Sequence, residues 1–473
     1  MMPVLDQLRA IVGDAYVRHE GDLSAWERDW SGRYHGRALA VVLPSNVTQV
    51  AAVLKVCAAA SLSVIPQGGN TGMVGGGVPD HTGRQVVLST RRLDRIRALD
   101  VANLTLTVEA GCILHAIQMH AEASGLLFPL SLAAQGSCTI GGNLATNAGG
   151  IQVLRYGNAR EMCLGLEVVT ADGQIWDGLS GLRKDNTGYN LRDLFVGSEG
   201  TLGIITAATL KLQPRPRSQL TAWAVLDSVS DAVALLGLSR SNLGPDLTSF
   251  ELMSDESICL LALHHPPRQP LPAAGPWSVL IEASGTCDET TLGERLQGLL
   301  EQAITQGIVR DVVLSTSLAQ SRNLWQAREA LPLAQSAAGP ALRHDISLPI
   351  SAIDDFLQET NGVLTGTFPG VKIRCFGHLG DGNLHYNMQA PEGVDPQAYL
   401  AAHESAIHDI VWSRVSQRGG SIAAEHGIGQ KMVAPLQRYK SPVALGLMHA
   451  IKRSLDPYAL LNPGRILGEL QQP

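Results

Sequence analysis

The sequence predicts an α+β protein with more than one domain. The chain has 473 residues, more than a single hydrophobic core usually serves. Over residues 1–215, short apolar runs typical of strands alternate with stretches of helical periodicity. Residues 213–217, Gln-Pro-Arg-Pro-Arg, mark a boundary, because prolines interrupt regular structure. The pattern changes after this point, so a second domain with its own core follows.

The first predicted domain, residues 1–215, combines helices with strands. A helix is expected to start near Ser45 as N-cap, since Val50, Val53, Leu54 and Cys57 recur at helical spacing. The remaining elements are strands at 39–43, 62–65, 86–88, 104–108, 164–170 and 202–212, and a helix at 113–124 that Gly125 ends.

The second predicted domain, residues 216–430, has strand-like runs at 219–226 and 277–283. These alternate with helical stretches at 228–240 and 288–306, which predicts an antiparallel sheet backed by helices. Residues 431–473 form a helical C-terminal segment that we expect to return to the first domain.

Charge and cysteine usage exclude several classes of protein. The net charge of −7 and the lack of a Lys/Arg cluster argue against a nucleic-acid partner. The seven cysteines are scattered without a Cys-x-x-Cys pair, which excludes a zinc knuckle or disulfide framework and fits a reducing compartment. No signal peptide or bilayer-spanning apolar run is apparent. We therefore expect a cytoplasmic protein without a transmembrane segment, and a peripheral membrane contact stays open.

A glycine-rich loop follows the predicted strand at 62–65. Residues 66–77 read Pro-Gln-Gly-Gly-Asn-Thr-Gly-Met-Val-Gly-Gly-Gly. A strand that leads into such a turn lets backbone N–H groups converge on an anion. A flexible surface loop is an equal alternative for this segment alone.

A second segment of this kind favours a cofactor. Residues 131–150 are rich in glycine and in small polar side chains, with Ile140 and Leu144 embedded among them. Two such segments in one domain indicate a large phosphate-bearing cofactor. Neither matches Gly-x-Gly-x-x-Gly in a βαβ unit, so a Rossmann domain is disfavoured.

Two histidines flank a predicted tight turn in the second domain. Residues 380–383, Gly-Asp-Gly-Asn, form the turn, so His378 and His385 can face one pocket. Glu425 and His426 follow later as neighbours. Two histidines and a carboxylate suit Zn²⁺, Mn²⁺ or Fe²⁺, with a position left for substrate. The alternative is that these are ordinary polar turn residues.

Two arginines are candidates for binding a carboxylate, because the guanidinium offers a planar fork of donors. Arg328 lies on a predicted helix, and Arg343 precedes or opens a strand. The alternative is an ion pair with a neighbour, Arg328 with Glu329 or Arg343 with Asp345.

These motifs together resemble a known family. The segments at 66–77, 135–150 and 196–205 resemble the flavin-binding (PCMH-type) domain of the vanillyl-alcohol oxidase superfamily. Residues 377–385, 424–427 and 461–464 resemble its D-2-hydroxyacid dehydrogenase branch, which includes D-2-hydroxyglutarate and D-lactate dehydrogenases and the D subunit of glycolate oxidase. The resemblance runs in order from about residue 38 to 467.

The resemblance implies FAD, held mainly by the first domain. Residues 68–73 and 131–150 would bind the pyrophosphate and isoalloxazine, and 200–205 would lie along the adenine. Some members tether the flavin through a histidine in the first glycine loop, where this chain has Asn70, so non-covalent FAD is expected. The implied FAD-binding residues are Gly68, Gly69, Asn70, Thr71, Gly72, Met73, Ser131, Gly136, Ser137, Thr139, Gly142, Asn143, Thr146, Asn147, Gly149, Gly150, Gly200, Ile204, Ile205 and Asn462.

The same resemblance assigns the second site. It implies that His378, His385 and Glu425 are metal ligands, with Zn²⁺ expected before Mn²⁺ or Fe²⁺, and that His426 is the general base. The metal would lower the pKa of the substrate's 2-hydroxyl, His426 would take the proton, and the C2 hydride would pass to flavin N5. The implied substrate-binding residues are Arg328, Arg343 and Asn387.

The sequence departs from the hydroxyglutarate dehydrogenases at two positions. Pro332 stands where they have a threonine, and Arg343 stands where they have a lysine. Both belong to the pocket for the far carboxylate, and proline removes a hydroxyl donor and perturbs a helix. D-2-hydroxyglutarate and D-lactate-like substrates therefore both stay open.

Two other functions reuse the same flavin domain. A non-redox transferase of the alkylglycerone-phosphate synthase type would not need the two-histidine site, and a non-catalytic electron-relay subunit would not need a base. The electron acceptor, an electron-transfer flavoprotein, a quinone or a cytochrome, stays open. A homodimer is favoured only by base rates.

Overall fold

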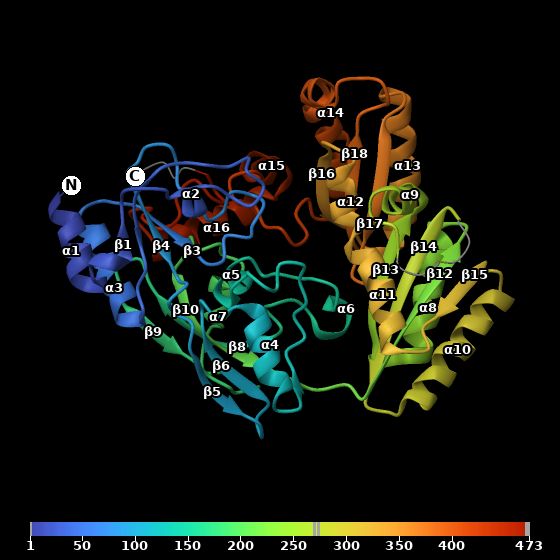
Figure 1. Ribbon diagram of the computed structural model, residues 1–473. Coiled ribbons are helices and arrows are strands. Elements are labelled where there is room, and N and C mark those ends of the chain that lie inside the picture. The colour runs from blue at the N-terminus through green and yellow to red at the C-terminus, as the bar shows by residue number, and fades with distance from the viewer. Residues whose placement is uncertain (1, 268–270, 272–274, 469–473) are drawn as a thin grey trace. The chain divides into compact units, whose positions relative to one another are not determined.

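The computed structural model describes residues 2–267, 271 and 275–468. The chain divides into two compact units. The first contains the residues up to 150, 157–215 and those from 425 onward, and the second contains 151–156 and 216–424. Figure 1 shows the helices and strands of both units.

The first unit contains a four-stranded sheet that delivers the first glycine loop. Its strand order is β1-β2-β4-β3, with β2 and β3 parallel to β4 and β1 antiparallel to β2. Helices α1 and α3 pack their apolar residues against this sheet, so the core here is formed mainly by Val, Leu and Ala. The strands are β1 (Val17–Arg18), β2 (Ala38–Val42), β3 (Val64–Gln67) and β4 (Gln85–Ser89).

A five-stranded antiparallel sheet completes the core of this unit. Its order is β5-β6-β10-β8-β9. The buried carboxylates of Glu109 and Glu167 form an ion-pair network with Arg95 and Arg97. The strands are β5 (Ile96–Asp100), β6 (Thr105–Glu109), β8 (Cys163–Val169), β9 (Ile175–Gly178) and β10 (Ile204–Lys211), and β7 (Leu126–Leu127) pairs with β11 (Gln213–Pro214).

The helices of the first unit include the two predicted from periodicity. Helix α3 is capped by Asn46, whose side chain accepts from the Gln49 N–H at 2.9 Å. The expectation of Ser45 as N-cap is therefore wrong by one residue, because Asn46 is the residue whose oxygen reaches that N–H. The helices are α1 (Met2–Val12), α2 (Ser24–Glu27), α3 (Val47–Ala59), α4 (Leu114–Glu122), α5 (Ile140–Ala145), α7 (Arg192–Phe195), α15 (Val433–Tyr439) and α16 (Pro442–Leu455).

The second unit is built on one seven-stranded sheet. Its order is β15-β12-β14-β13-β17-β18-β16, and every neighbouring pair is antiparallel, as the sequence predicts. The strands are β12 (Ser218–Leu226), β13 (Leu247–Ser254), β14 (Trp277–Gly285), β15 (Asp311–Leu314), β16 (Leu342–Ser347), β17 (Lys372–Gly377) and β18 (Asn383–Gln389).

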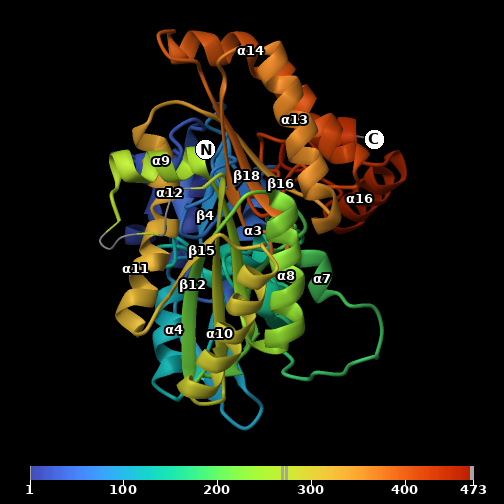
Figure 2. The ribbon, with the colours of Figure 1, turned by 90° about the vertical axis from the view of Figure 1, so that its right-hand side faces the viewer.

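Helices cover both faces of this sheet. Helices α8 and α10 pack on one face (Figure 2). On the other face, Leu324 and Trp325 of α11 and Leu261 of α9 join a core with Trp223 and Phe376. The helices are α6 (Val153–Tyr156), α8 (Val229–Leu243), α9 (Asp255–His264), α10 (Glu289–Thr305), α11 (Leu318–Glu329), α12 (Leu331–Ala337), α13 (Ile353–Thr367) and α14 (Pro396–Gln417).

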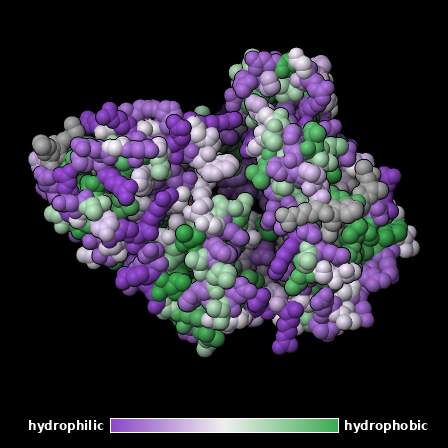
Figure 3. Space-filling view, in the orientation of Figure 1, coloured by the Kyte–Doolittle hydropathy of each residue, from purple (hydrophilic) through white to green (hydrophobic). Residues whose placement is uncertain are grey.

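The surface mixes polar and apolar residues. In the view of Figure 3, hydrophobic residues are interspersed among hydrophilic ones. Among the residues that the structure describes, no helix combines the length and apolar character needed to cross a bilayer.

Candidate functional site

The two glycine-rich segments lie against each other in the first unit. A Cβ added to Gly68 would overlap the hydroxyl of Thr139, and one added to Gly69 would overlap the carbonyl oxygen of Ser137. Glycine is therefore required where the loop after β3 meets the segment before α5. We call residues 68–73 and 131–150 the flavin cradle.

The flavin cradle has the properties of a site for a polar cofactor. The buried Oγ1 of Thr139 and Oδ1 of Asn143 have no hydrogen-bond partner among the described residues. The same is true of Oδ1 of Asn462, in the segment that follows α16. A buried polar atom without a partner costs about 1–3 kcal/mol, so a ligand is expected to satisfy it. A Cβ at Gly72 or Gly136 would meet nothing within 4 Å, which leaves space beside the backbone. These residues fit FAD.

Other predicted FAD-binding residues hold the cradle in shape. The amide of Asn70 donates to the carbonyl oxygens of Ala25 and Arg28 at 3.1 and 2.8 Å. Thr146 donates to the Gly142 carbonyl at 3.0 Å, and Asn147 accepts from the Arg160 N–H at 3.0 Å. The side chains of Asn70, Thr146 and Asn147 therefore hold the backbone of the flavin cradle in place.

The remaining predicted FAD-binding residues lie in turns, in loops or in the core of the first unit. Ser131 lies with its carbonyl oxygen against Gly150, the neighbour of Gly149, and Ser137 donates weakly to Ala134 at 3.4 Å. Ile204 and Ile205 are buried at the start of β10. Thr71 and Met73 lie in the loop after β3.

The chain returns to the cradle's strand after α16. Leu461 forms a parallel bridge with Val64 of β3, and Asn462 donates to the carbonyl oxygens of Gly76 and Glu199 at 2.9 and 2.7 Å. Glu199 has a positive φ of 49° and neighbours Gly200. Its carboxylate accepts from the N–H groups of Ile428 and Gly429 at 2.7 and 2.8 Å. Burial raises the pKa of Glu199, although these two hydrogen bonds oppose the shift.

One face of the seven-stranded sheet carries a row of charged side chains in the second unit. Strand pairing sets Asp345 of β16 opposite His385 of β18, and His385 opposite Phe376 of β17. Next to β17, Leu252 of β13 pairs with Gly377, so Glu251 comes beside His378. Residues far apart in the sequence therefore meet on this face.

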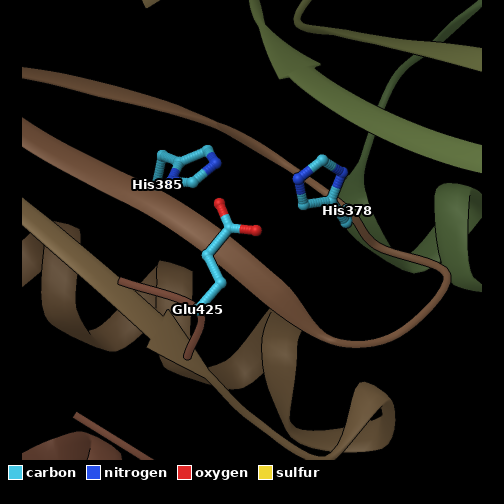
Figure 4. Close-up of side chains that lie close together, drawn as sticks. All are labelled: His378, His385 and Glu425. Carbon is cyan, nitrogen blue, oxygen red and sulfur yellow. The ribbon is translucent and has the colours of Figure 1, made fainter. Parts of the chain in front are cut away.

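The predicted metal ligands come together. His378 and His385 flank the turn between β17 and β18, and Gly382 in that turn has φ +84°, with no room for a Cβ beside the carbonyl oxygen of Leu348. One ligand atom each from His378, His385 and Glu425 lie within 4.8 Å of one another (Figure 4). Glu425 directly follows Ala424, whose N–H donates to the Asp345 carbonyl at 3.1 Å. Two imidazoles and a carboxylate at this spacing suit a divalent cation.

Glu251 links one of these histidines to Arg328. Its Oε1 lies 2.7 Å from Nδ1 of His378, and its Oε2 accepts a hydrogen bond from Nε of Arg328 at 2.9 Å and forms an ion pair with Nη2 at 2.7 Å. Arg328 is only 4% exposed and also lies over the ring of Phe376. Burial raises the pKa of the Glu251 carboxyl, but its interactions with His378 and Arg328 outweigh burial and hold the pKa below its usual value. We call Glu251, Arg328, Asp345, His378 and His385 the sheet-face site.

The other predicted substrate-binding residues lie further along the same strands. Arg343 of β16 pairs in register with Asn387 of β18. Nη2 of Arg343 donates to Ser336 at 2.8 Å, and the buried Asn387 amide donates to Gln335 at 2.9 Å. Both partners belong to α12, the helix that Pro332 opens.

The predicted base follows the last residue of the metal cluster. His426 is partly exposed, and its Nε2 lies 3.7 Å from Oε1 of Glu425. The backbone N–H groups of Ile428 and Gly429 donate to the carboxylate of Glu199. These hydrogen bonds fix the backbone directly after Glu425 and His426.

Sequence reasoning missed Glu251 and misassigned the partner of Arg328. The ion pair is with Glu251 and not with Glu329, because β13 brings Glu251 beneath α11. The available signal was a single carboxylate in the middle of Thr248-Ser-Phe-Glu-Leu-Met253, a run otherwise suited to a buried strand. Glu199 lies in the segment 196–205, but the sequence of that segment does not predict its hydrogen bonds with residues 428 and 429.

Two family models match the chain. The model described as "FAD linked oxidases, C-terminal domain" matches residues 215–466, more than half of the chain, and the model described as "FAD binding domain" matches residues 38–178. Together with the cradle, these matches define the class of protein. The chain belongs to the FAD-linked oxidases and is a flavoprotein.

Curated relatives narrow the class. A mitochondrial D-2-hydroxyglutarate dehydrogenase from Arabidopsis thaliana is 37% identical, covering 97% of this chain and 80% of its own length. D-2-hydroxyglutarate dehydrogenases from Bos taurus and Xanthomonas citri are 37% and 38% identical, covering 98% and 94% of this chain and 83% and 92% of their own lengths. The chain is thus an FAD-linked D-2-hydroxyacid dehydrogenase, an oxidoreductase.

Solved structures confirm the predicted fold class. A p-cresol methylhydroxylase with substrate bound matches with a TM-score of 0.77 at 18% identity, covering 99% of this chain and 97% of that one. An alkyldihydroxyacetonephosphate synthase matches with a TM-score of 0.73 at 15% identity, covering 98% and 85%. At these identities the likeness shows the fold alone, the vanillyl-alcohol oxidase type with its PCMH domain.

The expected cytoplasmic location is wrong. The relatives from Arabidopsis thaliana and Bos taurus carry "mitochondrial" in their names, as do those from Rattus norvegicus and Danio rerio. The scattered cysteines that suggested a reducing compartment do not distinguish between compartments inside the cell.

Proposed function

We propose that this enzyme oxidises D-2-hydroxyglutarate to the 2-oxo acid with the assistance of a divalent metal, Zn²⁺ before Mn²⁺ or Fe²⁺. The observation that carries the metal is the cluster of His378, His385 and Glu425 within 4.8 Å. The substrate is inferred from the names of the relatives. Arg343, in register with Asn387, supplies a cation suited to the second carboxylate of a diacid.

The two bound groups divide the chemistry. Non-covalently bound FAD would supply an acceptor for the C2 hydride at its N5 atom. The divalent cation would supply Lewis acidity, which lowers the pKa of the substrate's 2-hydroxyl. The flavin cradle would hold FAD through its backbone and through Thr139 and Asn143. His378, His385 and Glu425 would hold the divalent cation.

The chain's own side chains do the remaining work. His426 takes the proton of the 2-hydroxyl, which its partly exposed ring and its place beside Glu425 support. Arg343 and Asn387 bind carboxylate and orient the substrate. Arg328 is already paired with Glu251 through Nε and Nη2, so its contribution to a substrate carboxylate would come from Nη1.

The alternatives from the sequence have less support. A D-lactate-like substrate is supported by the name of a relative, a putative D-lactate dehydrogenase of Schizosaccharomyces pombe that is 36% identical to this chain. The transferase alternative has only the fold likeness to a synthase, at 15% identity. An electron-relay subunit would not need the paired histidines. The acceptor would be an electron-transfer flavoprotein, a quinone or a cytochrome.

Anaerobic bleaching of the flavin absorbance tests the proposal. D-2-hydroxyglutarate, D-lactate, D-malate and glycolate are each added to the purified protein, with and without a chelator. Bleaching by D-2-hydroxyglutarate that the chelator suppresses supports both substrate and metal. Bleaching by D-lactate alone would contradict the substrate, bleaching that the chelator leaves unchanged would contradict the metal, and no bleaching by any acid would favour the transferase.

A further inference from the structure

A buried carboxylate outside the predicted ligand set contacts one of the ligands. Glu251 is 1% exposed, and both of its oxygens are used. Oε1 lies 2.7 Å from Nδ1 of His378, and Oε2 accepts a hydrogen bond from Nε of Arg328 at 2.9 Å and lies 2.7 Å from its Nη2. All three residues belong to the second unit, on β13, α11 and the turn after β17.

The contact fixes which nitrogen of His378 carries a proton. The hydrogen bond from Nε of Arg328 and the ion pair with its Nη2 identify Glu251 as an ionised carboxylate, which can only accept hydrogen bonds. Nδ1 of His378 must therefore be the donor. The neutral imidazole then has its lone pair on Nε2, the atom that would ligate a metal.

Asp345 lies 3.9 Å from Nδ1 of His385, beyond hydrogen-bond distance, and the same oxygen accepts from Asn383 at 2.9 Å. The contact with Glu251, by contrast, orients the ring of His378 and sets its tautomer before any metal binds.

We propose that Glu251 is a positioning residue of the metal site, which presents Nε2 of His378 to the cation. The inference rests on the metal site of the proposed function and goes beyond it, because it assigns a role to a residue outside the ligand set. Glu251 also holds Arg328, so one carboxylate joins the metal ligand to the arginine on α11.

Glutamine at this position separates positioning from packing. Glu251→Gln keeps the shape of the side chain but replaces one acceptor oxygen with an NH₂ donor. If the amide oxygen stays with Arg328, the NH₂ group faces Nδ1 of His378 and favours the tautomer with its proton on Nε2, which blocks ligation. If the amide turns over, a donor faces Arg328 instead.

The experiment measures Co²⁺ affinity in the FAD-loaded, chelator-stripped full-length protein, by competition with a chelator, together with the visible spectrum of bound Co²⁺. We expect Glu251→Gln to weaken Co²⁺ binding by about 10- to 100-fold, the usual effect of removing such a partner, and to alter the spectrum. The matched control is Arg328→Lys, which keeps a cation beside Glu251 and the contact with His378 but loses the guanidinium, and should retain the affinity and spectrum.

The outcomes distinguish this inference from the proposed function. A wild-type protein that binds no Co²⁺ would refute the metal site itself and the role of Glu251 with it. Wild-type binding with unchanged affinity in Glu251→Gln would overturn the inference alone. An equal loss in Arg328→Lys would also overturn it, since the guanidinium of Arg328 would then be responsible. Should the buried Arg328 prevent Glu251→Gln from folding, the double variant Glu251→Gln/Arg328→Gln removes both charges and is judged against wild type, where unchanged affinity would overturn the inference.

Discussion

The flavin cradle and the sheet-face site are built by different means. The cradle uses backbone, glycine and small polar side chains from two short segments, and two of its buried polar atoms, Oγ1 of Thr139 and Oδ1 of Asn143, have no partner within the described chain. The sheet-face site uses polar and charged side chains from three strands, a turn and a helix, and Glu251 there already pairs with both Arg328 and His378. A cofactor that stays bound is met by polar atoms without partners and by space, whereas a site for exchangeable groups is held ready by contacts among its own side chains.

The largest expected effect separates cofactor binding from chemistry. His426→Ala should lower turnover by about 10²–10⁴-fold, the usual contribution of a general base, and should leave FAD bound. Steady-state kinetics and the flavin absorbance of the purified variant check both parts. His120→Ala, on the exposed face of α4, is the control and should behave as wild type. Full activity of His426→Ala would refute the base assignment, and loss of FAD would show that the two functions are not separable.

A smaller effect tests the far end of the sheet-face strands. Arg343→Ala should lower kcat/KM for D-2-hydroxyglutarate by about 10- to 100-fold, because a hydrogen bond to a charged group contributes about 1.5–3 kcal/mol. D-Lactate, which lacks the second carboxylate, should be affected much less. Arg322→Ala on the exposed side of α11 is the matched loss of an arginine. Equal losses on both substrates would mean that Arg343 binds the carboxylate that they share.

The close contact within the cradle predicts an effect on stability. Gly69→Ala places a Cβ where the Ser137 carbonyl lies and should lower the free energy of unfolding by about 1–3 kcal/mol, as overpacking does. Gly72→Ala has nothing within 4 Å and should leave the unfolding of the FAD-free protein unchanged. Urea denaturation of both FAD-free variants makes the comparison. Equal stability would show that the two segments do not meet as described.

The two regions also differ in how far the sequence predicts them. The cradle is predictable because its glycines and small polar residues follow one another along the chain, and the His-turn-His arrangement because Gly380-Asp-Gly382 sets it locally. Glu251 is not predictable, since its partner His378 is 127 residues away and the pairing of β13 with β17 brings them together. The same distance effect explains why the ion-pair alternative for Arg328 named the adjacent Glu329.

The smallest expected effect tests the idea that the cradle's buried polar atoms belong to the cofactor. Thr139→Val removes a buried hydroxyl that has no partner among the described residues but keeps the shape of the side chain. The FAD-free protein should be as stable as wild type or more so, while FAD affinity falls by about fivefold, the equivalent of about 1 kcal/mol for one hydrogen bond. Thr206→Val is the matched control. The buried hydroxyl of Thr206 does have a partner, because it donates to Glu167 at 2.8 Å within the same unit. This variant should destabilise the FAD-free protein and leave FAD affinity unchanged. If both variants lose stability alike and bind FAD alike, the hydroxyl of Thr139 serves the fold, and the contrast between an open cradle and a self-paired sheet face does not hold at this residue.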